Sequence, residues 1–192
     1  MRLKVPTVRS GTMYRSTKTF GHDLGISCAF RQWKATHSHC SKIHGYALSF
    51  HFVFEADQLD ERNWVMDFGG FKELKKMLTD SFDHKLIVAN DDPEKHRFTD
   101  LHHAGIADVV ILPRVGCEYF AEVAYSMAAS MLRKEMGDRV RLISATVSEH
   151  GANSATYTKE LNATKEIREL QAGLCAANDL VSRVTIIDEH GI

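Results

Sequence analysis

The sequence predicts an α+β fold in which helices cover one face of an antiparallel sheet. Short segments rich in aromatic and β-branched residues occur near both ends of the chain, and two segments between them repeat apolar residues every three or four positions. Strands grouped before and after a pair of helices are typical of this fold class. The 192 residues are enough for one domain with a substantial core, so we expect a single domain over residues 1–192.

The strands are expected where aromatic and β-branched residues form short runs bounded by turn residues. The clearest run is the segment 46–56, which contains three phenylalanines. A charged turn follows this run. Because a short turn between two strands forms an antiparallel hairpin, we expect the next apolar segment to pair with it in that way. In chain order, the expected strands cover residues 13–20, 26–32, 46–56, 64–68, 139–147 and 152–157.

Two helices are expected from apolar residues repeated at helical spacing. They cover residues 70–82 and 116–136. Residues 88–113 have no regular pattern and are expected to be irregular. A third helix is expected over residues 158–177, inside a C-terminal extension that covers residues 158–192.

Composition narrows the choice of partners. The net charge is −1, which gives no basic face, so we expect no nucleic-acid partner. No apolar run approaches the length of a membrane span, and residues 1–6 lack the apolar core of a signal peptide. We therefore expect no membrane partner and a cytoplasmic location. The four cysteines are scattered without a CxxC pair, which indicates free thiols in a reducing compartment.

The polar loop before residue 46 carries a thiol and several imidazoles. Cys40 has His39, Lys42 and His44 close by in sequence, and neighbouring cations lower the pKa of a thiol and activate it as a base or nucleophile. An ordinary free cysteine is the alternative. His37, His39 and His44 could also converge on a metal ion, since imidazole binds zinc well, but the same residues suit a plain polar loop.

Two further positions carry carboxylates. Asp83 directly precedes His84 at the end of the first helix, and such a carboxylate can hold an imidazole in one tautomer and raise its basicity. A helix C-terminal cap is the alternative. Glu149 ends an apolar strand, where it could bind a guanidine-like edge through two parallel hydrogen bonds or simply lie exposed at the strand end.

Six short pieces of the sequence, taken in order, form a specific set although each alone is weak. They are Ser27-Cys28-Ala29-Phe30-Arg31, Cys40-x-x-x-His44-Gly45-Tyr46, Val65-Met66-Asp67-Phe68 with Phe71-Lys72, Phe82-Asp83-His84-Lys85-Leu86, Gly116-Cys117-Glu118 and Val147-Ser148-Glu149. In this order they resemble the 6-pyruvoyl-tetrahydropterin synthase and 6-carboxytetrahydropterin synthase family. The resemblance spans residues 13 to about 157.

The resemblance implies the tunnelling fold, a four-stranded antiparallel sheet with two helices on one face. In this chain the helical C-terminal tail would be added to it. It also implies a homo-oligomer in which sheets join edge to edge into barrels, with a hexamer favoured and active sites between subunits. The partner would be a small-molecule pterin.

The resemblance also assigns roles. Cys40 would be the general base, Asp83 and His84 a proton relay, and Glu149 the residue that holds the amino-pyrimidine edge of the pterin. His44 matches one zinc ligand, and zinc in this family polarises the oxygens of the pterin side chain.

The zinc site departs from the family pattern, because its first and third histidines fall at Phe30 and Tyr46 here. His37 and His39 could supply replacement ligands, Cys28 could contribute a thiolate, or the site could hold no metal. We expect a zinc site built from His39 and His44.

The expected function is that of a lyase that converts 7,8-dihydroneopterin triphosphate to 6-carboxytetrahydropterin, on the route to queuosine-type deazaguanines. Two alternatives stay open. One is the 6-pyruvoyl-tetrahydropterin synthase reaction, which eliminates the triphosphate. The other is a metal-free module that binds a pterin or purine without turnover.

Overall fold

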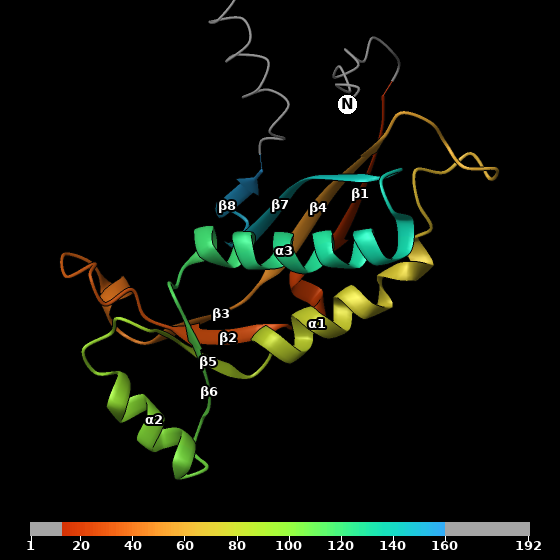
Figure 1. Ribbon diagram of the computed structural model, residues 1–192. Coiled ribbons are helices and arrows are strands. Elements are labelled where there is room, and N and C mark those ends of the chain that lie inside the picture. The colour runs from red at the N-terminus through yellow and green to blue at the C-terminus, as the bar shows by residue number, and fades with distance from the viewer. Residues whose placement is uncertain (1–12, 160–192) are drawn as a thin grey trace, which may run out of the picture. The chain divides into compact units, whose positions relative to one another are not determined.

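The computed structural model describes residues 13–159, and these residues form two four-stranded sheets and three α-helices (Figure 1). The expected helix over 158–177 falls almost wholly outside the described residues, as does the rest of the C-terminal extension. Thr158 itself is the last residue of a strand.

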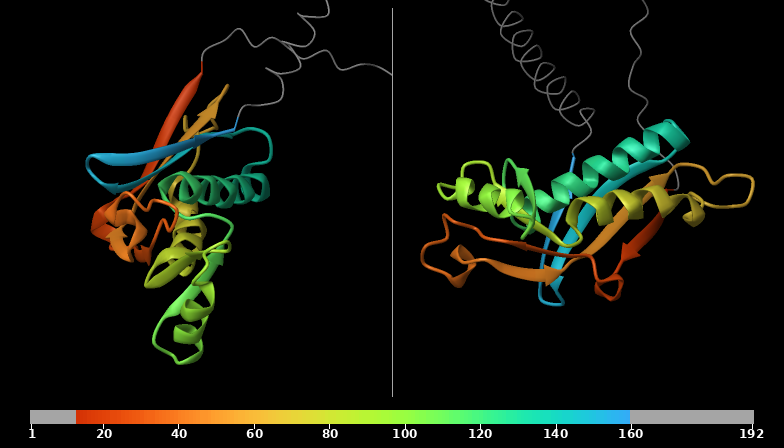
Figure 2. Two further views of the ribbon diagram at one scale, coloured as in Figure 1. Left: turned by 90° about the vertical axis from the view of Figure 1, so that its left-hand side faces the viewer. Right: turned by 90° about the horizontal axis from the view of Figure 1, so that it is seen from below.

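The first sheet is the predicted antiparallel sheet. Its strand order is β1-β4-β7-β8, and each neighbouring pair is antiparallel. Helices α1 and α3 lie on one of its faces, with α3 across β7 and β8 and α1 beside α3 (Figures 1 and 2). The predicted α+β fold class is therefore confirmed. The bounds are β1 Tyr14–Phe20, β4 Ser49–Ala56, β7 Arg141–His150, β8 Asn153–Thr158, α1 Lys72–Phe82 and α3 Cys117–Met136.

The second sheet was not predicted. It has the order β3-β2-β5-β6, with β2 antiparallel to β3 but parallel to β5, and β5 parallel to β6. Helix α2 connects β5 to β6 and projects away from the first sheet (Figures 1 and 2). The bounds are β2 Ser27–Phe30, β3 His44–Ala47, β5 Lys85–Ala89, α2 Lys95–His103 and β6 Asp108–Leu112.

Residues 88–113 are therefore not irregular, as the sequence pattern had indicated. Helix α2 escaped detection because Phe98 is its one buried residue, so it has no apolar repeat. Strand β6 is only five residues long, begins with Asp108, and pairs in parallel with β5 rather than folding back in a hairpin.

The expected single strand over 46–56 is interrupted at Leu48. The backbone N–H of Leu48 donates to the carbonyl of Ile26 at 2.7 Å, and the chain passes there from β3 in the second sheet to β4 in the first. One apolar segment thus supplies a strand to each sheet, which links the two sheets covalently beside the candidate site.

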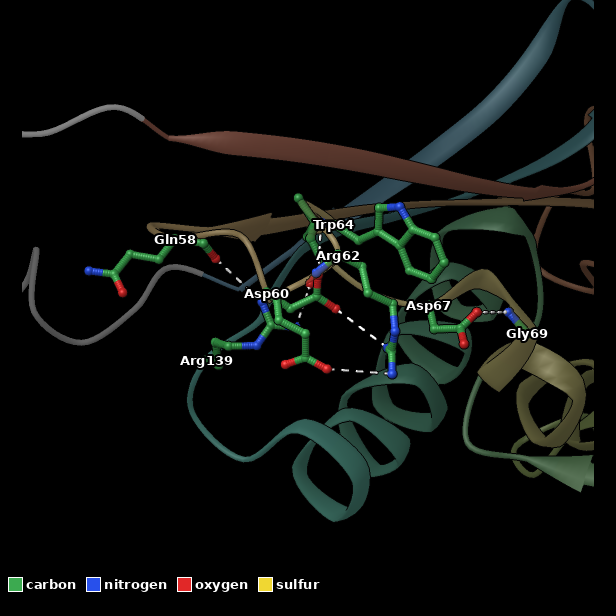
Figure 3. Close-up of polar contacts among 9 residues, drawn as sticks. Gln58, Asp60, Arg62, Trp64, Asp67, Gly69 and Arg139 are labelled. Atoms are coloured by element: carbon green, nitrogen blue, oxygen red, sulfur yellow. Dashed lines mark hydrogen bonds and ion pairs between the residues drawn. The ribbon is translucent and has the colours of Figure 1, made fainter.

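The expected strand over 64–68 is wrong, and the segment is a loop (Figure 3). The Asp60 carboxylate accepts the backbone N–H groups of Arg62 and Trp64, both at 2.9 Å, so the chain turns where a strand would need ladder partners. Val65 and Met66 are buried against the core all the same. Their apolar character reflects loop burial rather than strand pairing.

The core joins both sheets to the helices through aromatic rings. Phe120 of α3 packs edge-on against Phe30 of β2 and Phe82 of α1, with ring centroids 5.1 and 5.3 Å apart. Phe50 of β4 contacts Phe82 in turn, at 5.3 Å. Because Phe120 touches both the second sheet and α1, it fixes β2 relative to the helix layer.

Removing the Phe120 ring should therefore cost stability. We expect Phe120→Ala to lower the free energy of unfolding by about 3–5 kcal/mol, since it leaves a cavity between the rings of Phe30 and Phe82. Urea denaturation followed by circular dichroism measures the change. Ile106→Ala is the control because this side chain is 73% exposed, and it should change stability by less than about 0.5 kcal/mol. Equal losses in the two variants would contradict the role of Phe120.

Candidate functional site

The hairpin of β2 and β3 brings three motif positions together. Phe30 lies opposite His44, and Cys28 lies opposite Tyr46 in the antiparallel register. Cys28 and Phe30 face the core, where they are 3% and 0% exposed. The rings of Phe30 and His44 have centroids 4.8 Å apart, and Tyr46 lies 5.5 Å from His44 and 6.4 Å from Phe30. Side chains at these positions therefore converge on one face of the hairpin.

The tautomer of His44 follows from its backbone contact. His44 Nδ1 lies 2.8 Å from the carbonyl oxygen of Lys42. A carbonyl can only accept, so Nδ1 carries the proton and Nε2 keeps its lone pair.

Cys40 is held by a short 3-10 turn, His39–Ser41. The Cys40 N–H donates to the Ser38 hydroxyl at 3.2 Å, and the Cys40 carbonyl accepts the N–H of Gln32 at 2.8 Å. The second bond ties the turn to the chain just past the end of β2. The half-buried thiol is thereby anchored beside the hairpin, while His39 in the same turn is exposed.

Glu149 of β7 lies close to the same hairpin. Burial, followed by the negative charge of Glu149, raises the pKa of the Cys28 thiol to about 12. Burial and then Glu149 also raise the pKa of the Cys117 thiol to about 12. Both thiols are thus protonated at neutral pH, and both lie near the Glu149 carboxylate.

Tyr46 connects Cys40 to Glu149. Burial raises the pKa of the Tyr46 hydroxyl, the negative charge of Glu149 raises it further, and the Cys40 and Cys117 thiols make smaller contributions. These groups must lie within electrostatic reach of the phenol. The structure thus brings the candidate base and the candidate ring-binding carboxylate together around one tyrosine. We call this set the Tyr46 cluster; it consists of Cys28, Cys40, Tyr46, Cys117 and Glu149.

Asp83 and His84 form a second, separate constellation. The Asp83 carboxylate accepts the backbone N–H of Ser27 at 3.1 Å and lies 3.0 Å from His84 Nδ1. The Ser27 hydrogen bond, more than the imidazole, lowers the pKa of Asp83. His84 has a backbone φ of +58°, a strained value for a residue with a side chain, and its N–H is held at 2.7 Å from the Ser27 carbonyl.

The constraint on His84 aims an exposed imidazole at a pocket. The His84 side chain is 85% exposed, and the pocket has a volume of about 550 Å³. Its lining includes Ala29 and Gly45, which alternate with the core-facing residues of β2 and β3 and so lie on the opposite face of the hairpin. Cys28 and Tyr46 of the same two strands also contribute to the lining. Residues 106–108 form a further wall, where Asp108 pairs with Lys85.

Within residues 13–159 of one chain, no hydrogen bond or ion pair joins His84 to Cys40 or Glu149. Asp83 is the C-cap residue of α1, whereas the alternative that the sequence had left open was a cap by His84. The relay role of Asp83 and His84 stays a prediction, as do the roles of Cys40 and Glu149.

The comparisons with known proteins agree with this geometry. The family model described as 6-pyruvoyl tetrahydropterin synthase matches residues 22–160. The chain belongs to this family. A 6-carboxy-5,6,7,8-tetrahydropterin synthase of Rickettsia conorii is 38% identical over 83 residues, or 43% of this chain and 56% of that protein. A Rickettsia felis protein of the same name is 36% identical over 83 residues, again 43% of this chain and 56% of that protein. The chain thus matches about half the length of these curated relatives.

Solved structures share the fold of this family member at low identity. An uncharacterised protein from Wolinella succinogenes superposes with a TM-score of 0.62 and 18% identity, over 78% of this chain and all of that one. The 6-pyruvoyl tetrahydropterin synthase of Plasmodium vivax gives 0.58 and 15%, over 78% of this chain and 99% of that one. Among the described residues, no helix has the length and apolarity needed to cross a bilayer.

The three positions that carry zinc histidines in the family do not fit that site here. Phe30 has no atom that can bind a metal, and Tyr46 offers a protonated phenol, so His44 is the one imidazole of the three. Across residues 13–159, no three or more His, Cys, Asp or Glu side chains are grouped to hold a metal ion. Zinc bound by His39 and His44 stays a prediction.

Sequence reasoning missed the contributions of Tyr46 and Cys117 to the site. Strand alternation places Cys28 and Phe30 on one face of their strand, but it does not show which residues of other strands and helices lie beside them. The register of β2 against β3 could not be read, because 13 residues separate the two strands (Phe30 to His44) and only short hairpin loops fix register.

The Asp83 contacts predict a pH-dependent contribution to stability. Replacing Asp83 by Asn should cost about 1–2 kcal/mol at pH 7, the value of hydrogen bonds to a charged acceptor. Because folding lowers the pKa of Asp83, this contribution is complete above the pKa of the unfolded chain, near 4, and is lost as the pH falls through the lower folded pKa.

The measurement is urea denaturation of both proteins from pH 7 down to pH 2. Asp80→Asn, which removes an exposed carboxylate paired with Lys76, is the control and should cost less than about 0.5 kcal/mol. A difference between wild type and Asp83→Asn that stayed constant to the lowest pH would show that the carboxylate charge is not responsible.

Proposed function

We propose that this protein is a pterin lyase that converts 7,8-dihydroneopterin triphosphate to 6-carboxytetrahydropterin. The supporting observation is the Tyr46 cluster, in which Cys40 and Glu149 both contribute to the raised pKa of the Tyr46 phenol. A base for the side chain and a carboxylate for the ring can thereby serve the same bound molecule. The two Rickettsia relatives carry the name of this activity.

Binding would begin at Glu149. A carboxylate accepts two parallel N–H bonds from an amino-pyrimidine edge, which fixes the plane and the direction of the ring. The Cys117 thiol lies near this carboxylate. Ring binding at Glu149 orients the 6-substituent toward the other residues of the cluster.

Cys40 would then take a proton from the side chain of the pterin as general base. Asp83 and His84 would handle protons on the other side of the substrate, where the Asp83 contact leaves His84 Nε2 as the exchanging atom. In one chain His84 opens into a pocket on the opposite face of the hairpin. A homo-oligomer, with a hexamer favoured, would bring His84 of one subunit to the Tyr46 cluster of another.

The sheet edges support such an assembly. In the described part of the chain, β1 and β8 each have one neighbour, so the outer backbone groups of both strands lack ladder partners within the subunit. Edge strands of this kind pair with other chains unless they are covered. The free thiols Cys28, Cys40 and Cys117 fit a reducing compartment such as the cytoplasm, where the product would feed queuosine-type deazaguanine synthesis.

A second candidate function is a binding module without turnover. Phe30 and Tyr46 favour it, because they replace two imidazoles of the family's zinc site while Glu149 is kept. The 6-pyruvoyl-tetrahydropterin synthase reaction is a variant of the first proposal and differs in the product alone.

The lyase proposal is tested by incubating the purified protein with 7,8-dihydroneopterin triphosphate and following the products by mass. A 6-carboxytetrahydropterin product supports it, and loss of triphosphate to a 6-pyruvoyl product selects the variant. A folded protein that binds the pterin but forms neither product, with or without added zinc, would select the binding module.

The role of Cys40 is tested by Cys40→Ala. Without its base the enzyme should lose at least about 100-fold in kcat, while pterin affinity changes by less than about threefold. Thr36→Ala, an exposed residue of the same loop, is the control and should keep the full rate. If Cys40→Ala kept the kcat of the wild type, Cys40 would not be the general base.

Glu149→Gln tests ring binding. Loss of the charge should weaken pterin binding by about 10-fold or more, measured by quenching of pterin fluorescence. Glu73→Gln is the control. It removes an exposed carboxylate of α1 that pairs with Lys134 near the C-terminal end of α3, and it should leave binding unchanged. Equal affinity in wild type and Glu149→Gln would contradict the ring-binding role.

A further inference from the structure

Tyr46 occupies a position at which the family has a zinc-binding histidine, so a tyrosine there is unusual. Its ring packs against His44 at 5.5 Å and against His150 at 6.0 Å, so it is fixed between two imidazoles. Its ring neighbour His150 directly follows Glu149 on β7, and Tyr46 lies opposite Cys28 in the register of β2 and β3. The phenol therefore lies beside the residue proposed to hold the pterin ring.

Phe30 fills the position of the first zinc histidine of the family. Its side chain is fully buried and contacts His44 at 4.8 Å and Phe120 at 5.1 Å. An aromatic ring in van der Waals contact with both neighbours fills the space that a first imidazole ligand would need. The three positions form a packed aromatic group rather than a set of converging lone pairs.

The Tyr46 O–H is available as a donor. An ordinary tyrosine phenol has a pKa of about 10 and is protonated at neutral pH. Among the hydrogen bonds between residues 13–159, none uses the Tyr46 hydroxyl. Its side chain is half-buried, and so it can reach a bound molecule.

We propose that Tyr46 takes over the electrophilic role of the missing metal by donating a hydrogen bond to an oxygen of the pterin side chain. Positions 30, 44 and 46 hold no zinc, and this proposal replaces the zinc site expected from His39 and His44. This inference rests on the proposed lyase function and adds a catalytic residue to it.

The chemistry balances without a metal. A side-chain carbonyl must first form, because the substrate carries hydroxyl groups. The hydroxyl-bearing carbon attached to C6 loses its proton, the electron pair forms a C=C bond to C6, and the C6=N5 π pair moves to N5, which takes a proton. The resulting enol becomes a ketone when its hydroxyl loses a proton and C6 gains one.

Cys40, whose own proton has left to solvent, then takes the proton of the next carbon, beside this carbonyl, so that an S–H bond forms and the C–H bond breaks. The electron pair of that bond forms a C=C bond, and the carbonyl π pair moves to oxygen. The negative charge that develops on this oxygen is stabilised by the Tyr46 O–H, which is a preorganised donor of the oxyanion-hole type.

Tyr46→Phe is the most selective variant, because it removes the hydroxyl and keeps the ring packing. We expect kcat/KM to fall about 100-fold, as for loss of one oxyanion donor. Tyr14→Phe removes a hydroxyl from an exposed tyrosine at the start of β1 and should keep the wild-type rate. Full activity in Tyr46→Phe would overturn the proposal.

A binding measurement separates this inference from the lyase proposal. Neopterin has a hydroxylated side chain, and 6-methylpterin presents the same ring without side-chain oxygen. Tyr46→Phe should weaken neopterin about fivefold and leave 6-methylpterin unchanged, even if wild type has no lyase activity. Equal changes for both ligands, or no change for either, would contradict a contact between Tyr46 and the side chain.

The metal part of the proposal is tested without activity. Wild type should contain less than about 0.1 zinc per chain and give no tetrahedral absorption with Co²⁺. The double variant Phe30→His with Tyr46→His should gain both. Circular dichroism checks that this variant folds, since Phe30 is fully buried; if it does not, the wild-type zinc content decides. One zinc per wild-type chain, lost in His44→Ala, would overturn the proposal.

Discussion

The register between β2 and β3 is the constraint on which the candidate site depends. Pairing of Cys28 with Tyr46 and of Phe30 with His44 sends these four side chains to the core side of the hairpin, toward β7 and α3. A slip of one residue would reverse every side chain and turn Ala29 and Gly45 inward. The pairing is protected at Gly45, where an added Cβ would lie 2.8 Å from the Cys28 carbonyl oxygen. A glycine is therefore required for the two strands to approach this closely.

The same hairpin also anchors the second constellation. Ser27, the first residue of β2, binds Asp83 through its N–H and His84 through its carbonyl, so β2 contacts both candidate parts of the catalytic apparatus. The strain at His84 is offset by these bonds and by the start of β5. Strand β2 thus lies between two groups of candidate residues. Cys40 and Glu149 are on one side of it, and the exposed imidazole of His84 is on the other. Proton transfer on both faces of one flat substrate needs such groups on opposite sides, and assembly of subunits is the way in which this chain could supply them.

The first sheet and its two helices could be predicted because their signals are local. β4 contains a run of alternating phenylalanines, and α1 places Leu74, Leu78 and Phe82 on one buried face. The second sheet could not be predicted, since β2 pairs in parallel with β5 from 55 or more residues away and no local pattern records that contact. The motif residues could be found from their order, but their arrangement depends on this non-local sheet. The Tyr46 hydroxyl and the Cys117 thiol were missed for the same reason.

The proposed function and the role of Tyr46 both require one arrangement: a pterin ring held by Glu149 extends its side chain between Cys40 and Tyr46. A crystal structure of the assembled protein with bound neopterin tests this most directly. The account predicts the amino-pyrimidine edge on the Glu149 carboxylate and a side-chain oxygen within hydrogen-bond distance of the Tyr46 hydroxyl. A pterin bound solely in the pocket beside His84, with Glu149 touching no ligand, would contradict it.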